Sequence, residues 1–91
     1  MGYWVYILRC SDNTLYTGST TEPERRLTVH QSGKGAKYTR SRLPVELVYQ
    51  EETSDKSAAL RREAAIKKMS RTEKLQLIHA AHIQLQRDAE A

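Results

Sequence analysis

The feature that most constrains the fold is a pair of short apolar runs near the start of the chain. Residues 3–9 (YWVYILR) and 15–20 (LYTGST) are separated by the polar cluster SDNT. Aromatic and β-branched residues favour strands, and Ser, Asp and Asn favour turns, so the two runs predict an antiparallel hairpin. Gly18 interrupts the second run, which is typical of a bulge or of a close backbone approach.

A short helix is predicted directly after the hairpin. Thr21-Glu22-Pro23-Glu24 fits a capping box, in which Thr21 accepts a hydrogen bond from the amide three residues on and Glu24 reaches back to the Thr21 amide. The helix should run to about Ser32 and end at Gly33, with Leu27 as its clearest apolar anchor. Residues 33–41 (GKGAKYTRS) are predicted to form a basic loop.

The second half of the chain predicts one more strand and two more helices. The strand spans residues 44–50 and places alternate apolar residues on one face, namely Val45, Leu47 and Tyr49. A helix capped by Ser54 or Asp55 follows to about Met69, with core candidates Leu60, Ile66 and Met69. A second capping box, Ser70 to Glu73, opens a helix over about 71–87 whose regular spacing includes Leu75, Ile78, His82 and Leu85.

These elements predict a single α+β domain over residues 1–91. A small, mixed antiparallel sheet of three strands should be flanked by helices, in the order β-β-α-β-α-α. The single cysteine, Cys10, excludes an internal disulfide, and no run approaches the ~20 apolar residues of a membrane span. The first ten residues lack the basic region of a signal peptide, so we expect a cytoplasmic protein that does not associate with membranes.

The positive charge of the chain is concentrated in its first half. Residues 1–42 carry seven Lys/Arg against three Asp/Glu, whereas residues 43–91 carry eight of each, for a net charge of +4. A localised basic patch is typical of proteins that bind a polyanion, most often nucleic acid. We expect the densest group to contact a nucleic-acid backbone, with its tyrosine stacking on a base, although solvated loop charge is the alternative. The group consists of Lys34, Lys37, Tyr38, Arg40 and Arg42.

Polar residues of the hairpin and first helix suggest phosphodiester chemistry. Arg26 and His30 are four residues apart and therefore share a helix face. Tyr6 and Tyr16 are expected to lie nearly opposite each other in the hairpin. Hydrolysis of a phosphodiester needs stabilisation of charge on the phosphate, a base for the water and a cation near the leaving oxygen. Arginine supplies a planar fork of donors for phosphate, and phenols and imidazole relay protons.

The remaining requirement is a carboxylate for a metal ion. Glu63 is the best candidate, because it lies in a predicted helix near Ile66, which is expected to face the core. A simple ion pair with Lys67, four residues further on, is the alternative for this carboxylate.

In these positions the chain resembles the GIY-YIG endonuclease superfamily, over about residues 3–70. The first motif falls on Trp4-Val5-Tyr6, with Trp4 in place of Gly, and the second on Tyr16-Thr17-Gly18. The helix arginine, the histidine and the metal carboxylate follow at Arg26, His30 and Glu63. The segments LYTGSTTEPERRL, SGKGAKYTR and RREAAIKK are most similar to the small, stand-alone bacterial members. No Asn follows the carboxylate, as it does in larger members.

The resemblance implies a role for each of these residues. Tyr6 would be the general base for the water, Tyr16 would orient the water or the scissile phosphate, and Arg26 would stabilise charge on the phosphate. His30 would assist proton transfer or position Tyr6. Glu63 would hold one divalent ion, Mg²⁺ or Mn²⁺, and Gly18 would allow a tight backbone turn beside the site. Because a free tyrosine has a pKa of about 10, we expect Arg26 and a metal-bound water to lower the pKa of Tyr6.

Two functions remain open from the sequence. The favoured one is a metal-dependent endonuclease that hydrolyses phosphodiester bonds in DNA, including structured, branched or damaged DNA in repair or recombination. The alternative is a non-catalytic module that binds DNA or RNA and keeps the nuclease fold. Glu63 favours the enzyme, because a lone carboxylate repels phosphate unless a cation lies on it. A third, weaker option is a protein-interaction role that uses the last helix. Separately, a protein partner for substrate targeting is an expectation for the enzyme. We expect a monomer or a weak homodimer.

Overall fold

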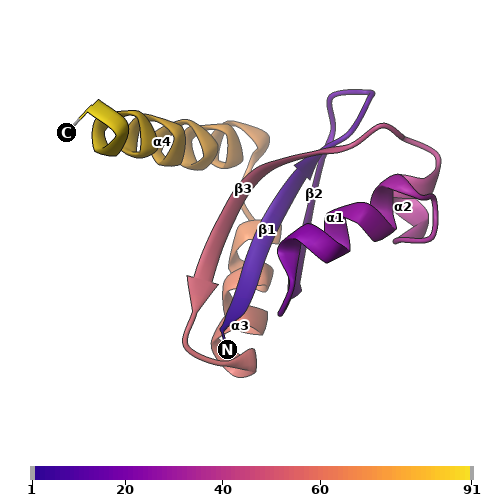
Figure 1. The fold of residues 1–91 in the computed structure, drawn as a ribbon, viewed down its shortest axis with the longest axis horizontal. Coiled ribbons are helices and arrows are strands. Elements are labelled where there is room, and N and C mark those ends of the chain that lie inside the picture. The colour runs from indigo at the N-terminus through magenta and orange to yellow at the C-terminus, as the bar shows by residue number, and fades with distance from the viewer. Residues whose placement is uncertain (1, 91) are drawn as a thin grey trace.

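The structure is a computed structural model that describes residues 2–90, with the side chains of residues 2–81. Its strands are β1 (Tyr3–Arg9), β2 (Leu15–Thr20) and β3 (Glu46–Thr53), and its helices are α1 (Pro23–Gln31), α2 (Lys37–Arg40), α3 (Lys56–Lys67) and α4 (Arg71–Glu90). The strands form one sheet in the order β2-β1-β3 with both pairings antiparallel, so it is not mixed. The predicted α+β class and element order are confirmed, with the short helix α2 added inside the predicted basic loop (Figure 1).

The central strand β1 sends alternate side chains into two apolar layers. Val5 and Ile7 are fully buried on one face, where Ile66 of α3 packs against them. Leu8 is fully buried on the other face, with Leu27 of α1 packed against that layer. The helices α1 and α3 therefore lie on opposite faces of the sheet, and both contact its edge strand β2. This arrangement allows both helices to contribute side chains to the β2 edge.

The third strand differs from its prediction. It begins at Glu46 and ends at Thr53, later at both ends than the predicted 44–50. The register on β1 shifts between Ile7, which pairs with Tyr49, and Leu8, which pairs with Leu47. One extra residue on β3 is a β-bulge, and it reverses the alternation of side chains. Leu47 and Tyr49 therefore join different apolar layers, and the prediction that they share a face was wrong.

The start of α1 also differs from its prediction. Its N-cap residue is Glu22, and no side chain caps the helix, so the predicted capping box at Thr21 is wrong. Pro23 occupies the first turn, where a missing amide is tolerated and the fixed backbone angle suits a helix. The end is as predicted within a residue, and Gly33 follows it with a positive φ of 80°.

The caps of the last two helices are confirmed. Asp55 accepts from the Ala58 amide at the start of α3, and Ser70 and Glu73 exchange hydrogen bonds before α4. The predicted core contacts hold for Ile66, Met69 and Ile78, but Leu60 and Leu75 are exposed. The helix α3 ends at Lys67, before Met69, and α4 continues to Glu90, beyond the predicted 87. The side chains of His82 and Leu85 lie outside those described.

Within the described residues, no helix combines the length and the apolar character needed to cross a membrane.

Candidate active site

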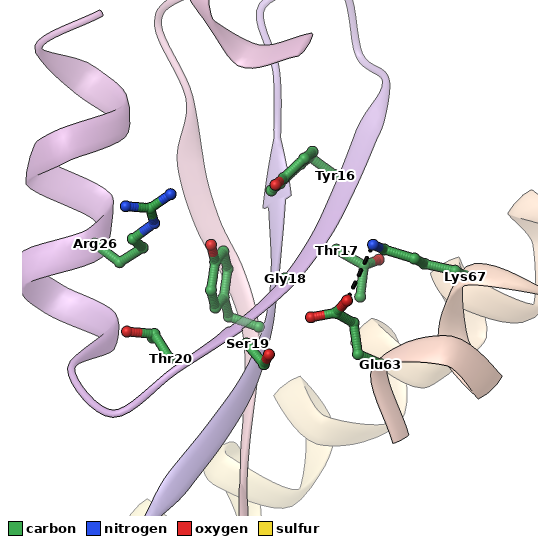
Figure 2. A pocket seen from close by; sticks show the side chains of 9 residues that line it. Tyr16, Thr17, Gly18, Ser19, Thr20, Arg26, Glu63 and Lys67 are labelled. Carbon is green, nitrogen blue, oxygen red and sulfur yellow. Dashed lines mark hydrogen bonds and ion pairs between the residues drawn. The ribbon is translucent and has the colours of Figure 1, made fainter. Parts of the chain in front are cut away.

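A pocket of about 300 Å³ opens along the β2 edge of the sheet. Arg26 enters it from α1 and Glu63 enters it from α3, on opposite sides (Figure 2). Tyr6 of β1 and Tyr16 of β2 line the same pocket. The complete lining consists of Tyr6, Tyr16, Thr17, Gly18, Ser19, Thr20, Arg26, Glu63 and Lys67. The fold thus brings four of the five predicted catalytic residues to one cavity, and the fifth, His30, contacts Tyr6.

The hairpin register places the two phenols and explains Gly18. Tyr6 pairs with Gly18 and Tyr16 pairs with Leu8, so the phenols share a face but lie diagonally, not opposite each other as predicted. A β-carbon on Gly18 would lie 2.5 Å from the Tyr6 Oη and 2.7 Å from its Cζ, which is closer than real contacts. The glycine therefore leaves room for the Tyr6 ring. Neither interpretation from the sequence, a bulge or a close backbone approach, accounts for Gly18, because the β1–β2 ladder is regular and the close contact is with the Tyr6 side chain.

A buried chain of polar contacts leads away from Tyr6. Its Oη lies 3.2 Å from the Nε2 of His30, and the Nδ1 of His30 lies 2.8 Å from the Oγ1 of Thr39. The Thr39 hydroxyl lies 2.9 Å from the carbonyl oxygen of Ala36 and donates to it. His30 and Thr39 are both 0% exposed. The imidazole therefore has fixed partners on both ring nitrogens, one of which is the phenol that lines the pocket.

Burial sets the protonation of these groups. It raises the pKa of the Tyr6 phenol above its ordinary value, and the nearby Arg26 offsets this only in part. The expectation that Arg26 lowers the pKa of Tyr6 is thus not met by Arg26 alone. Burial, and secondly the charge of Arg26, lower the pKa of His30. At pH 7 the phenol is therefore protonated and the imidazole is neutral, so the imidazole has one nitrogen able to accept a proton.

Glu63 is the carboxylate of the pocket, and it already has a cationic partner. The Nζ of Lys67 lies 3.0 Å from its Oε2, with side chains 53% and 19% exposed for Lys67 and Glu63. No cluster of three or more metal-ligating side chains occurs among the described residues. The donor set still suits a hard cation such as Mg²⁺, which is commonly bound by one carboxylate, waters and substrate phosphate. The Lys67 ammonium shows that a positive group is accommodated on this carboxylate.

The hydroxyl of Thr17 is a second group in the pocket that can bind a polar ligand. The Oγ1 of Thr17 is the buried side-chain oxygen that has no hydrogen-bond partner within the part of the chain whose side chains are described. Buried hydroxyls are normally paired, so this one has capacity for a polar group bound in the pocket. In the sequence, Thr17 lies in the second motif and has no predicted role. Its buried, unpaired hydroxyl and its place in the same pocket lining as Glu63 identify it as a candidate binding group.

The predicted nucleic-acid contacts gather beside the pocket, around α2. A shallow cavity there is lined by Lys37, Tyr38, Arg40, Ser41 and Arg42. The Tyr38 ring stacks on Tyr16, with centroids 6.0 Å apart, which joins this surface to the candidate site. Arg42 differs from the other cations, because its guanidinium donates to Asp12 and to the Tyr38 carbonyl and lies 3.9 Å from the centre of the Tyr38 ring. Lys34 is exposed and does not line this cavity.

Two residues beside the candidate site were missed by the sequence analysis. Thr39 was included only as part of the basic loop, and its contact with His30 depends on α2 folding back against α1. Lys67 was considered only as an ion-pair partner for Glu63, yet it lines the pocket. Lys67 follows Glu63 by one helical turn, which gave a signal for its place, whereas nothing in the local sequence marks Thr39.

Comparisons of this chain with a family model and with known proteins agree on one family. A model of the GIY-YIG catalytic domain matches residues 2–76. A UPF0213 protein of Staphylococcus haemolyticus is 58% identical over 76 residues, which cover 84% of this chain and 93% of that protein. A UPF0213 protein of Syntrophus aciditrophicus is 64% identical over 76 residues, covering 82% and 87%. The names of these relatives state no reaction.

Solved structures show the same fold. The solution NMR structure of a protein from E. faecalis has a TM-score of 0.62 and 45% identity, and the match covers 91% of this chain and 88% of that one. The solution NMR structure of a UPF0213 protein from Bacillus halodurans has a TM-score of 0.57 and 48% identity, covering 88% and 85%. From the domain match and these relatives, we conclude that the chain belongs to the GIY-YIG nuclease family, among its small UPF0213 members.

Proposed function

We propose that the chain is an endonuclease that hydrolyses phosphodiester bonds in nucleic acid with the help of one divalent ion, Mg²⁺ or Mn²⁺. One observation carries the proposal: Tyr6, Tyr16, Arg26 and Glu63 line a single pocket, and His30 holds the Tyr6 phenol from behind. DNA is favoured over RNA through the resemblance to the endonuclease superfamily, and branched or damaged DNA is included among the substrates to be tested.

Three residues would handle the phosphate and the proton. Arg26 lines the pocket opposite Glu63, where its planar fork can bind the scissile phosphate and stabilise the charge that develops on it. A water between Tyr6 and the phosphorus would give its proton to the Tyr6 oxygen as the phenol gives its own proton to the Nε2 of His30. This paired transfer suits the protonation states of the two groups, because the phenol is protonated at pH 7 and the imidazole is neutral.

Tyr16 and Thr17 would position the reactants. Tyr16 lies diagonally from Tyr6 on the same face of the hairpin, where its phenol can orient the water or the phosphate. The Thr17 hydroxyl, buried without a partner, would donate to an oxygen or a bound water in the pocket.

Glu63 would hold the divalent ion, with waters and phosphate oxygens as the other ligands. When bound, the ion would supply a positive charge near the leaving oxygen. Lys67 would then leave the carboxylate and lie beside the phosphate, since its ammonium already lines the pocket.

The test is a cleavage assay on single-stranded, duplex and branched DNA and on RNA, with Mg²⁺, Mn²⁺ or EDTA. Glu63→Gln keeps the size of the side chain and removes its charge. We expect cleavage that requires a metal ion and falls at least about a hundredfold in this variant, as for groups that stabilise the transition state directly. The matched control is Glu52→Gln, since Glu52 is exposed on β3, at the other edge of the sheet.

The alternative, a binding module without catalysis, is supported by the basic surface around α2, which lies beside the pocket and not within it. Nucleic-acid binding that is unchanged by EDTA, with no cleavage of any substrate in Mg²⁺ or Mn²⁺, would support that alternative and contradict the nuclease. Cleavage that survives in purified Glu63→Gln would contradict the role of this carboxylate.

A further inference from the structure

Thr39 is a buried hydroxyl whose contacts the proposed reaction does not use. It lies in the one-turn helix α2, is 0% exposed, and places its Oγ1 between two groups. The Nδ1 of His30 lies 2.8 Å away and the carbonyl oxygen of Ala36 lies 2.9 Å away. A short polar residue is thus inserted between the backbone of the basic segment and the imidazole that contacts Tyr6.

The donors and acceptors in the series of contacts from Tyr6 to Ala36 can be counted. A threonine hydroxyl carries one proton, and a carbonyl oxygen only accepts. If the hydroxyl donates to Ala36, its lone pair faces His30, so the Nδ1 of His30 must carry the proton. A neutral imidazole then has no proton on Nε2, and that nitrogen accepts from the Tyr6 phenol. In this arrangement every donor and acceptor of these contacts has a hydrogen-bond partner.

The reverse arrangement leaves one proton without a partner among the described side chains. If Thr39 donated to Nδ1, the Nε2 of His30 would carry the proton and donate to the Tyr6 oxygen. The Tyr6 hydroxyl proton would then need another acceptor. Arg26, which lines the same pocket, only donates, so this proton would depend on a water in the pocket. The groups at the two ends of this row of hydrogen bonds, Tyr6 and Ala36, therefore favour the form of His30 with the proton on Nδ1.

We propose that Thr39 is a positioning residue that keeps the proton of His30 on Nδ1 and thereby presents the bare Nε2 to the Tyr6 phenol. In its catalytic consequence this inference rests on the proposed nuclease function, because Nε2 is the atom that would receive the Tyr6 proton. The protonation pattern itself does not depend on that function. An imidazole with its proton on Nε2 would have no lone pair on the side of Tyr6.

The segment that carries Thr39 also contacts His30 through a second residue, Gly35. A β-carbon on Gly35 would lie 2.4 Å from the Nδ1 of His30 and 2.9 Å from its Cα. The backbone of residue 35 thus lies against the imidazole on the same side as Thr39. The basic segment 33–41 therefore both presents cations to the solvent and fixes the ring behind the pocket.

The direct test is nitrogen NMR of the intact chain at pH 7.5, in which protonated and bare ring nitrogens give separate ¹⁵N signals. His30 is assigned by comparison with His30→Gln, because His79 and His82 remain as references. We expect a protonated Nδ1 and a bare Nε2 in the wild type and in Thr39→Ser. Thr39→Val keeps the shape and removes the hydroxyl, so we expect the Nδ1 proton to be lost in part or entirely.

The functional test uses the same variants in the cleavage assay. We expect Thr39→Val to lower kcat by about ten- to hundredfold with little change in KM, in line with the effect of removing groups that orient a functional histidine. Thr39→Ser should restore most of the rate. In a His30→Gln background, Thr39→Val should have no further effect, because Thr39 acts through His30. The matched control is Thr28→Val on the exposed side of α1.

Each result decides the inference. A proton on Nε2 of His30 in the wild type overturns it, and so does an unchanged Nδ1 proton in Thr39→Val. If Thr39→Val does not fold, Thr39→Ala replaces it in the same comparison of ring-nitrogen signals. If the chain cleaves nothing while His30 shows the expected pattern, the nuclease function fails and the positioning of His30 by Thr39 stands. An equal loss of rate from Thr39→Val in the wild-type and His30→Gln backgrounds overturns the link between the two residues.

Discussion

Gly18 lies directly across the β1–β2 pairing from Tyr6, and the Tyr6 ring fills the space that a side chain at position 18 would need. A hairpin needs a continuous hydrogen-bonded ladder and room for its side chains, and this glycine meets both needs. The glycine of the second motif is thus explained by the tyrosine of the first. The pairing also keeps the Tyr6 oxygen at 3.2 Å from His30.

Gly18→Ala is therefore expected to disturb Tyr6 before anything else. The new methyl group would lie 2.5 Å from the Tyr6 Oη, so the ring must shift, and its contact with His30 must change with it. We expect a loss of about 1–3 kcal/mol in the free energy of unfolding, typical of overpacking, and a fall in cleavage rate of at least tenfold. Urea denaturation and single-turnover cleavage measure the two effects.

The matched control for that substitution is Gly2→Ala. A β-carbon there would meet only the end of the Glu52 side chain, which is exposed and can turn aside. Its stability and rate should match the wild type. A Gly18→Ala variant with normal cleavage would show that the position of the Tyr6 phenol does not matter for the reaction.

Tyr6→Phe removes the phenol oxygen and keeps the ring. We expect the cleavage rate to fall by about a hundred- to ten-thousandfold, the range for loss of a general base or acid. The fold should remain, with a loss of about 1 kcal/mol because the Nε2 of His30 loses its partner. Tyr3→Phe, on the other face of β1, is the matched control. A purified Tyr6→Phe protein that cleaves at an appreciable rate would remove Tyr6 from the proposed proton path.

His30 should make both stability and cleavage depend on pH below neutrality. Its pKa is lowered in the folded chain, so below about 6.5, the ordinary histidine value, the unfolded chain binds more protons. The stabilising effect of a neutral His30 is therefore complete above that pH and is lost as the pH falls through its folded pKa. Cleavage should fall in the same direction, because a protonated imidazole cannot accept the Tyr6 proton.

Urea denaturation at pH 7.5 and 5.5 tests this dependence. The difference in unfolding free energy between the two pH values should be smaller in His30→Gln than in the wild type. His79→Gln, at an exposed position on α4, should keep the full difference. A wild-type stability that rises on going to pH 5.5, and no longer does so in His30→Gln, would contradict the lowered pKa.

Much of this architecture could be predicted from the sequence because its signals are local. Turn residues, strand-forming runs and the caps at Asp55 and Ser70 act within a few residues, and they gave the hairpin and the last two helices. The bulge in β3 could not be predicted in this way, because it depends on the register with β1. It placed Leu47 and Tyr49 on different faces despite their even spacing.

In the candidate site, too, the features set by local sequence could be predicted and those set by tertiary contacts could not. The order and spacing of Tyr6, Tyr16, Arg26, His30 and Glu63 suggested that they meet, and the fold brings them together. The burial of His30 and its contact with Thr39 were not foreseen, because a histidine late in a short helix normally faces the solvent. They arise from the packing of α2, which lies within the predicted basic loop, against the helix α1.

Lys67 should weaken the binding of a metal ion to Glu63, but only slightly. Their ion pair joins residues one helical turn apart at a site that is half exposed on the lysine side, so it contributes about 0.3–0.5 kcal/mol. Lys67→Gln should therefore raise the affinity for Mn²⁺ by no more than about twofold. Titration followed by electron paramagnetic resonance measures it, with Lys68→Gln as the exposed control. A marked loss of Mn²⁺ affinity in Lys67→Gln would contradict competition between the two cations.

Arg40 and Arg42 are neighbours in the sequence that should behave differently. Arg40 is exposed at the rim of the cavity beside the candidate site, whereas the donors of Arg42 are directed to Asp12 and to the Tyr38 carbonyl. We expect Arg40→Ala to weaken nucleic-acid binding for all sequences and to reduce the salt dependence of Kd by about one counterion, as for loss of a phosphate contact.

Arg42→Ala should instead act on stability. Its guanidinium lies 3.9 Å from the centre of the Tyr38 ring, a contact that contributes about 0.5–1 kcal/mol at an exposed site, and it ties α2 to the β1–β2 turn through Asp12. We expect a lower free energy of unfolding with an unchanged salt slope, because the donors of Arg42 are already directed to Asp12 and to the Tyr38 carbonyl. Fluorescence anisotropy at several salt concentrations and urea denaturation separate the two effects. A reduced salt slope in Arg42→Ala, equal to that of Arg40→Ala, would show that Arg42 leaves its internal partners to bind the nucleic acid.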